Sequence, residues 1–284
     1  MTAISMAERM EEMASSAPAA EYIPRFGIQQ RIQHFLMMTS FLLLVFTGLP
    51  QKFNDASLSQ WWMGVLGGVD NARMVHRFAA WTMIIDCLYH ISYIAFSTVA
   101  LRRKFPIWAI PSLKDAQDLF HDFEYFFGRR TDRPRFGRFS YLEKFDYWAI
   151  FWGIPVIAGS GLILMFPVAA TKFLPGVAVP VAFLAHSDEA VLAVLWVFIV
   201  HFFFVHLGPH VFPFNPSMFT GKMSREQYKV LHPLELEEME AREGRRLAKQ
   251  ERDEVATASA SQESAPVAAD ASHVAGEQTE GQSA

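Results

Sequence analysis

Six of the ten histidines in this 284-residue chain lie in or beside long apolar stretches. These six are His34, His76, His90, His186, His201 and His206. A polar ring inside hydrocarbon is unfavourable unless it has a partner, so six such residues indicate a chemical role. Imidazole is a common axial ligand of haem iron and of other metals, which makes ligation the first chemistry to consider.

The spacing of four of these histidines supports ligation. His76 and His90 are 14 residues apart, which in an α-helix places them within about 40° of each other and roughly 21 Å apart along the axis. His186 and His201, 15 residues apart, fall within about 60° and about 22 Å. If both helices run in the same direction, His76 lies level with His186, and His90 with His201. Opposed imidazoles at two depths are the arrangement that holds two haem irons.

The same spacing is compatible with roles that need no metal. Each histidine could be a packed and hydrogen-bonded residue, or the set could form a proton relay with Asp86, four residues before His90. Zinc is disfavoured because ligands about 21 Å apart along a helix cannot share one ion. The single cysteine excludes an iron–sulfur cluster and a disulfide framework.

Four apolar segments are long enough to carry these residues across a membrane. At 1.5 Å per residue, a hydrocarbon core of about 30 Å requires about 20 mostly apolar residues. The segments that qualify are about 32–50, 74–100, 146–168 and 188–212. With 51% hydrophobic residues, 19% charged residues and a mean hydropathy of +0.15, the sequence predicts an all-α integral membrane four-helix bundle.

The distribution of charge predicts the orientation of these segments. Ten lysines and arginines lie between the second and third segments, whereas only Lys172 lies between the third and fourth. Because short basic loops stay in the cytoplasm, we expect a multi-pass protein of the bacterial cytoplasmic (inner) membrane with both termini cytoplasmic. The net charge of −4 gives no support for a nucleic-acid partner.

The rest of the chain divides by composition. Residues 1–24 are polar and acidic, without the features of a cleaved targeting signal, and residues 25–222 form the expected four-helix domain. Residues 223–253 are predicted to be a charged cytoplasmic helix, and 254–284 a disordered tail that cannot bury enough apolar surface to fold. Residues 101–145 interleave aromatic and charged side chains, which predicts a structured loop on the membrane surface or under a soluble partner.

Several short motifs along the chain form a set. They are Gln30-Arg31-Ile32-Gln33-His34, Thr47-Gly48, Arg73-Met74-Val75-His76, Ile110-Pro111, Lys114-Asp115, Lys144 with Trp148, His186, His201 and Gly221-Lys222-Met223-Ser224-Arg225. Together they resemble the membrane cytochrome b subunits of formate dehydrogenase, nickel-iron hydrogenase and related respiratory complexes, the gamma subunit of formate dehydrogenase most of all. The resemblance covers about residues 25–240 and is specific only as an ensemble.

The resemblance implies two b-type haems, one between helices two and four and one between helices one and four. Carried over, His76 and His186 hold the outer haem, and His34 pairs with His201 or His206 at the inner one. The spacing favours His90 with His201 instead, so the inner ligand is His34 or His90. Because depth also pairs His34 with His206, a third haem stays open beside the expected two.

The resemblance also implies a quinone or menaquinone site beside the inner haem, at the start of helix three. This chain has Ser140 and Glu143 there. A carboxylate at this point could accept a quinol proton. It could equally be a surface charge paired with Lys144 or Arg138.

The expected function is electron transfer across the membrane between the quinone pool and an iron–sulfur or multihaem subunit of the same complex. The sequence contains no CxxCH motif, cysteine cluster or Rossmann glycine pattern with which to oxidise a primary substrate, so a redox partner is required. Two alternatives are a haem-free membrane anchor or proton-conducting subunit, and a stand-alone transmembrane haem reductase.

Overall fold

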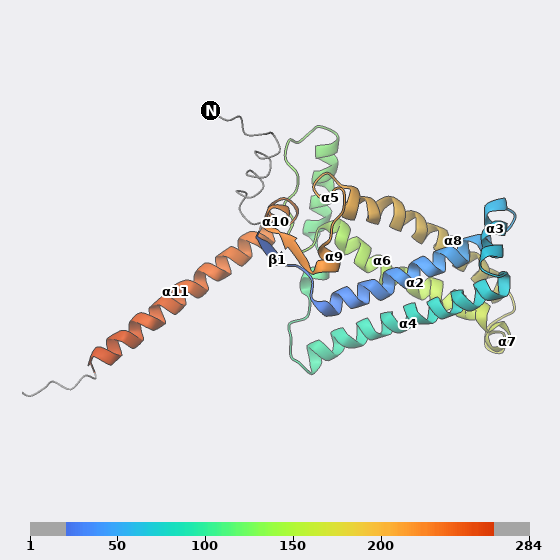
Figure 1. Cartoon of the computed structure of the whole chain (residues 1–284), viewed down its shortest axis with the longest axis horizontal. Coiled ribbons are helices and arrows are strands. Elements are labelled where there is room, and N and C mark those ends of the chain that lie inside the picture. Colours follow the sequence, from blue (N-terminus) through green and yellow to red (C-terminus); the bar gives the residue numbers. More distant parts are fainter. Residues whose placement is uncertain (1–20, 264–284) are drawn as a thin grey trace, which may run out of the picture. The chain divides into compact units, whose positions relative to one another are not determined.

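The computed structural model describes residues 21–263, and four long helices dominate this part of the chain (Figure 1). Three of them are α2 (Ile28–Lys52), α4 (Val69–Val99) and α6 (Tyr141–Met165). The fourth is α8 (Ala178–Leu195), which continues through two π-helical segments, η2 (Trp196–His201) and η3 (Phe203–Leu207). All four are long and apolar enough to cross a membrane, which confirms the predicted fold class.

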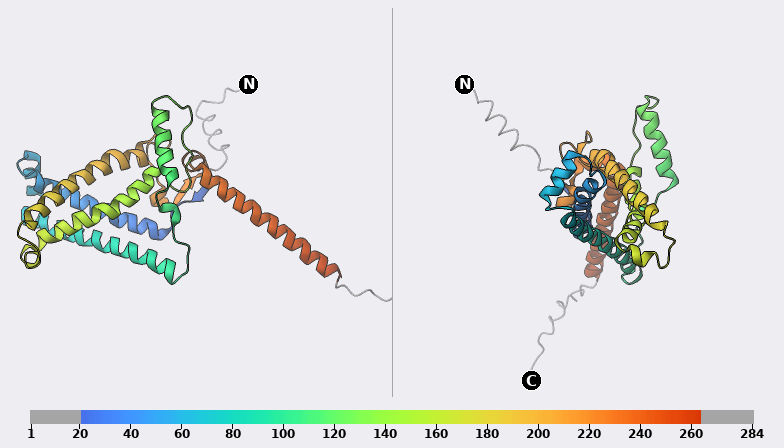
Figure 2. Two further views of the ribbon diagram at one scale, coloured as in Figure 1. Left: turned by 180° about the vertical axis from the view of Figure 1, so that it is seen from behind. Right: turned by 90° about the vertical axis from the view of Figure 1, so that its right-hand side faces the viewer.

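The four spans pack as two pairs, α2 with α4 and α6 with α8. Ala72 and Ala79 are fully buried on α4, where small side chains let neighbouring membrane helices approach closely. α2 is joined to α4 through the short helix α3 (Ser57–Val65), and α6 is followed by α7 (Pro167–Ala170). We call the end of the bundle with α3 and α7 the turn end and the opposite end the loop end (Figures 1 and 2).

The predicted segments have the right number and order, but their bounds need correction. The first three helices begin four or five residues earlier than predicted, because polar residues at their ends continue the helix. The fourth begins at Ala178 rather than 188, so His186 lies inside the span and not before it. Pro180 does not interrupt this helix because it sits in the first turn, where its missing N–H has no intrahelical acceptor.

The loop end carries the short elements. They are β1 (Tyr22–Pro24), η1 (Ile107–Ala109), α5 (Leu113–Phe126), α9 (Ser217–Thr220), β2 (Lys222–Ser224) and α10 (Arg225–Leu231). β1 and β2 pair antiparallel, with Ile23 opposite Met223. The buried Arg25 guanidinium pairs with Glu235 at 2.7 Å and with Glu143 at 3.3 Å. It therefore ties the start of the first span to the start of the third and to the chain after the fourth.

The charged region after the spans also differs from the prediction. Instead of one helix over 223–253, the chain forms β2, α10 and the long helix α11 (Pro233–Glu263). Residues 254–263, predicted to belong to a disordered tail, continue this helix. Salt bridges such as Glu238 with Arg242 support the exposed surface of its earlier part. The predicted tail beyond residue 263 and most of the predicted N-terminal tail, 1–20, lie outside the described residues.

Candidate functional site

His76 of α4 and His186 of α8 face each other near the turn end. Their ring centroids are 6.2 Å apart and their planes are inclined at 73°. A metal bound on both sides at about 2 Å, the usual metal–imidazole distance, needs ring nitrogens about 4 Å apart and centroids somewhat farther apart. The observed separation meets that requirement, and the predicted level matching of these two residues is the arrangement found.

Each of these rings is oriented through its Nδ1 atom. His76 Nδ1 lies 2.9 Å from Thr47 Oγ1, and His186 Nδ1 lies 2.8 Å from the Ile157 carbonyl oxygen. The Thr47 hydroxyl already donates to the Leu43 carbonyl, so it accepts from His76. Both rings therefore carry their proton on Nδ1 and keep the Nε2 lone pair for a ligand, as metal-binding histidines do.

Two glycines make room for these rings. A Cβ atom at Gly48 would lie 3.1 Å from His76 Cε1, and one at Gly161 would lie 2.9 Å from His186 Cε1. At Gly159, two residues before Gly161, an added Cβ atom would have nothing within 4 Å of it. The absence of a side chain at Gly48 and Gly161 is thus required by the histidine pair itself.

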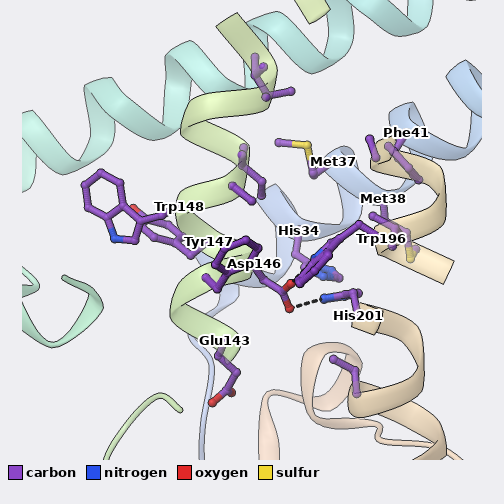
Figure 3. Close-up of a pocket in the computed structure, with 18 of the residues that line it drawn as sticks. His34, Met37, Met38, Phe41, Glu143, Asp146, Tyr147, Trp148, Trp196 and His201 are labelled. Atoms are coloured by element: carbon purple, nitrogen blue, oxygen red, sulfur yellow. Dashed lines mark hydrogen bonds and ion pairs between the residues drawn. The ribbon is translucent and has the colours of Figure 1, made fainter. Parts of the chain in front are cut away.

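A second cluster lies nearer the loop end and is centred on His201 (Figure 3). His201 Nδ1 lies 2.9 Å from Asp146 Oδ2, and the Trp196 indole donates to the other carboxylate oxygen at 2.7 Å. His34 of α2 points into the same pocket, and neither of its ring nitrogens has a hydrogen-bond partner among residues 21–263. His201 lies in η2 and His206 in η3, and π-helical turns occur frequently at functional sites.

The structure gives His90 and His206 other partners. His90 Nδ1 lies 2.9 Å from Gln33 Oε1, and its Nε2 lies 3.0 Å from the Tyr147 hydroxyl. Because both nitrogens are engaged, His90 has no free ring nitrogen for a metal, which favours His34 over His90 as the partner of His201. His206 Nδ1 accepts from the backbone N–H of Asn215 at 3.3 Å, so the neutral ring carries its proton on Nε2 and has no lone pair there for a metal.

Both clusters open into one cavity between the two helix pairs. Its volume is about 1960 Å³, roughly twice the upper end of the range for a small-molecule site. Its wall includes His34, His76, His186 and His201, and the basic residues Arg73 and Arg77 lie on it near the turn end. The cavity is therefore large enough for more than one sizeable group.

These residues fit haem better than a bare metal ion. No three His, Cys, Asp or Glu side chains come together as a metal site in the part of the chain that the structure describes. The two opposed imidazoles of His76 and His186, with free Nε2 atoms, would hold a haem between α4 and α8. The apolar cavity suits a planar macrocycle, so the donor set and its surroundings agree.

Ser140 and Glu143, the residues expected at a quinone site, cap the start of α6. Glu143 accepts from the Ser140 N–H at 2.8 Å, and Ser140 Oγ accepts from the Glu143 N–H at 3.3 Å. This is a capping box, and Glu143 also pairs with Arg25 rather than with Lys144 or Arg138. Both residues line the cavity, so the structure leaves a second role for them open.

Sequence reasoning missed most of the residues that orient the histidines. The role of Asp146 could have been suspected from the sequence, because a carboxylate inside an apolar segment needs a partner. The partner of His186 is a backbone carbonyl, which no residue type reveals. His232, just before α11, is buried against the Gly137 carbonyl, and burial lowers the pKa of its ring.

Comparison with known families gives one match. A family model described as prokaryotic cytochrome b561 matches residues 25–221, a region that contains all four spans and every histidine discussed above except His232. No curated protein matches the chain.

Proposed function

The chain belongs to the prokaryotic cytochrome b561 family, which makes it a membrane protein that binds b-type haem and transfers electrons, and from this premise we propose how it does so. We propose that it holds two haems. His76 with His186 are the axial ligands near the turn end, and His34 with His201 are those near the loop end.

The observation that carries this proposal is the pair His76 and His186. Their separation, their protonation on Nδ1 and the glycines beside them all favour axial ligation. At the loop end, the hydrogen bond from His201 to Asp146 is of the kind that orients metal-bound histidines, whereas His90 and His206 are engaged otherwise. Two haems rather than three follow from this assignment.

Haem, when bound, supplies a one-electron carrier at each of the two levels. The protein's own residues fix the orientation of the histidine rings through their Nδ1 atoms. The apolar side chains that line the cavity exclude water from it. We propose that electrons pass between a quinone or menaquinone at the loop end and an iron–sulfur or multihaem partner subunit. Support for the cytoplasmic placement of the loop end, and for the inner membrane as location, comes from the ten lysines and arginines of residues 101–145.

Haem stoichiometry with single substitutions tests the proposal. Wild-type protein is expected to contain two haems per chain by the pyridine haemochrome assay. His76→Ala and His186→Ala should each reduce this to one and remove the same spectral component. His90→Ala is the matched control and should retain both. A protein without haem would favour the membrane-anchor alternative, and loss of haem in His90→Ala would return that residue to the inner site.

The quinone proposal has its own test. Glu143→Gln keeps a side chain of the same shape that can still accept from the Ser140 N–H, but it removes the carboxylate as a proton acceptor. We expect haem reduction by a quinol to slow by about a hundredfold, the low end of the range for general-base catalysis, with an unchanged haem spectrum. Reduction by dithionite should be unaffected. An unaltered quinol rate would leave Glu143 with its structural role alone.

A further inference from the structure

The helix α5 has an exposed apolar face that no part of the described chain covers. Leu113 is 85% exposed, Phe120 is 68% and Phe127 is 76%, and Phe123 lies beside them. At 100° per residue these four positions fall within about 80° of one another. Such a face needs a partner, either another protein or the membrane.

The opposite face of α5 is acidic and is fixed to the protein. Asp115 pairs with Lys144 of α6 at 2.9 Å, and both Tyr141 and Arg133 contact the Asp122 carboxylate, at 2.9 and 3.2 Å. The side chains of Asp115, Asp118 and Asp122 lie about 150° around the helix from the apolar face. Lys144 and the Ser112 cap hold the pKa of Asp115 below its usual value, although burial opposes this. The rotation of α5 about its own axis is therefore set by these ion pairs.

This rotation decides where the apolar face points. α5 crosses the loop end at a large angle to the spans and stands to one side of them (Figures 1 and 2). The returning segment 127–140, which contains Arg133, runs along the side of α5 that is away from the spans (Figures 1 and 2). The acidic face turns both toward the start of α6, through Lys144 and Tyr141, and toward Arg133 of the returning segment, so the apolar face turns away from these two segments.

The charges at this end of the bundle suit lipid headgroups. Arg102, Arg103 and Lys104 are exposed where α4 ends, and Arg129 and Arg130 are exposed just after α5. Basic residues beside a membrane-surface helix are attracted to anionic lipids, and aromatic side chains concentrate at the same depth.

We infer that α5 is an interfacial helix that lies in the plane of the membrane beside the bundle, with its phenylalanines in the boundary between headgroups and acyl chains. Its salt bridge to Lys144 then fixes the start of α6, where Ser140 and Glu143 lie, at a defined membrane depth. The inference does not depend on the proposed function, because it uses only the fold and the membrane location.

Spin-label accessibility tests the inference in the full chain. In a Cys87→Ser background, which removes the only native cysteine, a nitroxide is attached at Phe123→Cys or at Gln117→Cys. Gln117 is exposed on the same helix but about 120° around it from Phe123. The protein is placed in phosphatidylcholine vesicles that contain phosphatidylglycerol. Collision rates are measured with oxygen, which concentrates in lipid, and with a nickel chelate, which stays in water.

The label at position 123 is expected to show a several-fold higher ratio of oxygen to nickel collisions than the label at 117. If the labels at both positions collide equally often with the nickel chelate, the inference is overturned and a soluble partner for this face is favoured. Wild-type protein provides a second measurement if the variants fold poorly. A lipid-borne diazirine should label the peptide 113–127 on illumination, and an unlabelled peptide would overturn the inference as well.

Discussion

The two histidine clusters hold the same kind of ring with different partners. At the turn end, Nδ1 of His76 faces a hydroxyl and Nδ1 of His186 faces a backbone carbonyl, both neutral acceptors. At the loop end, Nδ1 of His201 faces the carboxylate of Asp146. A carboxylate makes the imidazole a more basic ligand than a neutral acceptor does. The difference indicates how one helix bundle can give two similar sites different redox properties.

The clusters also differ in the number of candidate ligands. The turn end has only the two histidines it needs, whereas the loop end has His34, His201 and His206, with His90 nearby. At the loop end the residue type alone does not select the ligands. The hydrogen bonds of His90 and His206 disfavour these two residues, whereas His34 and the Nε2 atom of His201 have no hydrogen-bond partner among residues 21–263.

The largest effect should separate His201 from its neighbour His206. His201→Ala is expected to remove one of the two proposed haems, because it deletes a proposed ligand. His206→Ala should retain both, because Nδ1 of His206 accepts from Asn215 and its Nε2 carries the proton. Haem-to-protein ratios and reduced-minus-oxidised spectra measure both outcomes. The opposite result would exchange the roles of the two residues.

A smaller effect is expected from adding one methyl group at the turn end. In Gly161→Ala the new Cβ would lie 2.9 Å from His186 Cε1, so the ring must move, at an overpacking cost of about 1–3 kcal/mol. We expect partial loss of the turn-end haem and an unchanged loop-end component. Gly159→Ala is the matched control, because nothing lies within 4 Å of its Cβ position. Equal haem contents in the two variants would contradict the close packing of His186.

Much of this fold could be predicted from the sequence because membrane spans have a strong signature. Length and hydropathy identify four spans, and the level matching of His76 with His186 follows from helical geometry. The predicted start of the fourth span was ten residues too late: the helix begins at Ala178, and Asp188 and Glu189 lie inside it without interrupting it. The polarity of individual residues was therefore a poor guide to where that helix begins.

The loop-end site was harder to predict because it depends on contacts between distant segments. The choice between His34 and His90 depends on Gln33 and Tyr147, which come from two different helices and occupy both nitrogens of His90. The ion pair of Arg25 with Glu235 links residues 210 positions apart. No spacing rule along the chain indicates such contacts, and only the packed structure brings them together.

The smallest predicted effect tests the contrast between the clusters directly. Through its hydrogen bond with His201, the Asp146 carboxylate would stabilise the more positive, ferric state of the proposed loop-end haem. In Asp146→Asn the acceptor becomes neutral, so the reduction potential should rise. A hydrogen bond to a charged group is worth about 1 kcal/mol more than one to a neutral group, which for one electron corresponds to roughly 40 mV.

Potentiometric titration of the two spectral components measures the shift, with the turn-end component as an internal control in the same sample. A rise confined to the loop-end component is expected, because no carboxylate contacts Nδ1 of His76 or His186 in residues 21–263. Equal shifts of both components, or none, would show that Asp146 does not distinguish the two sites.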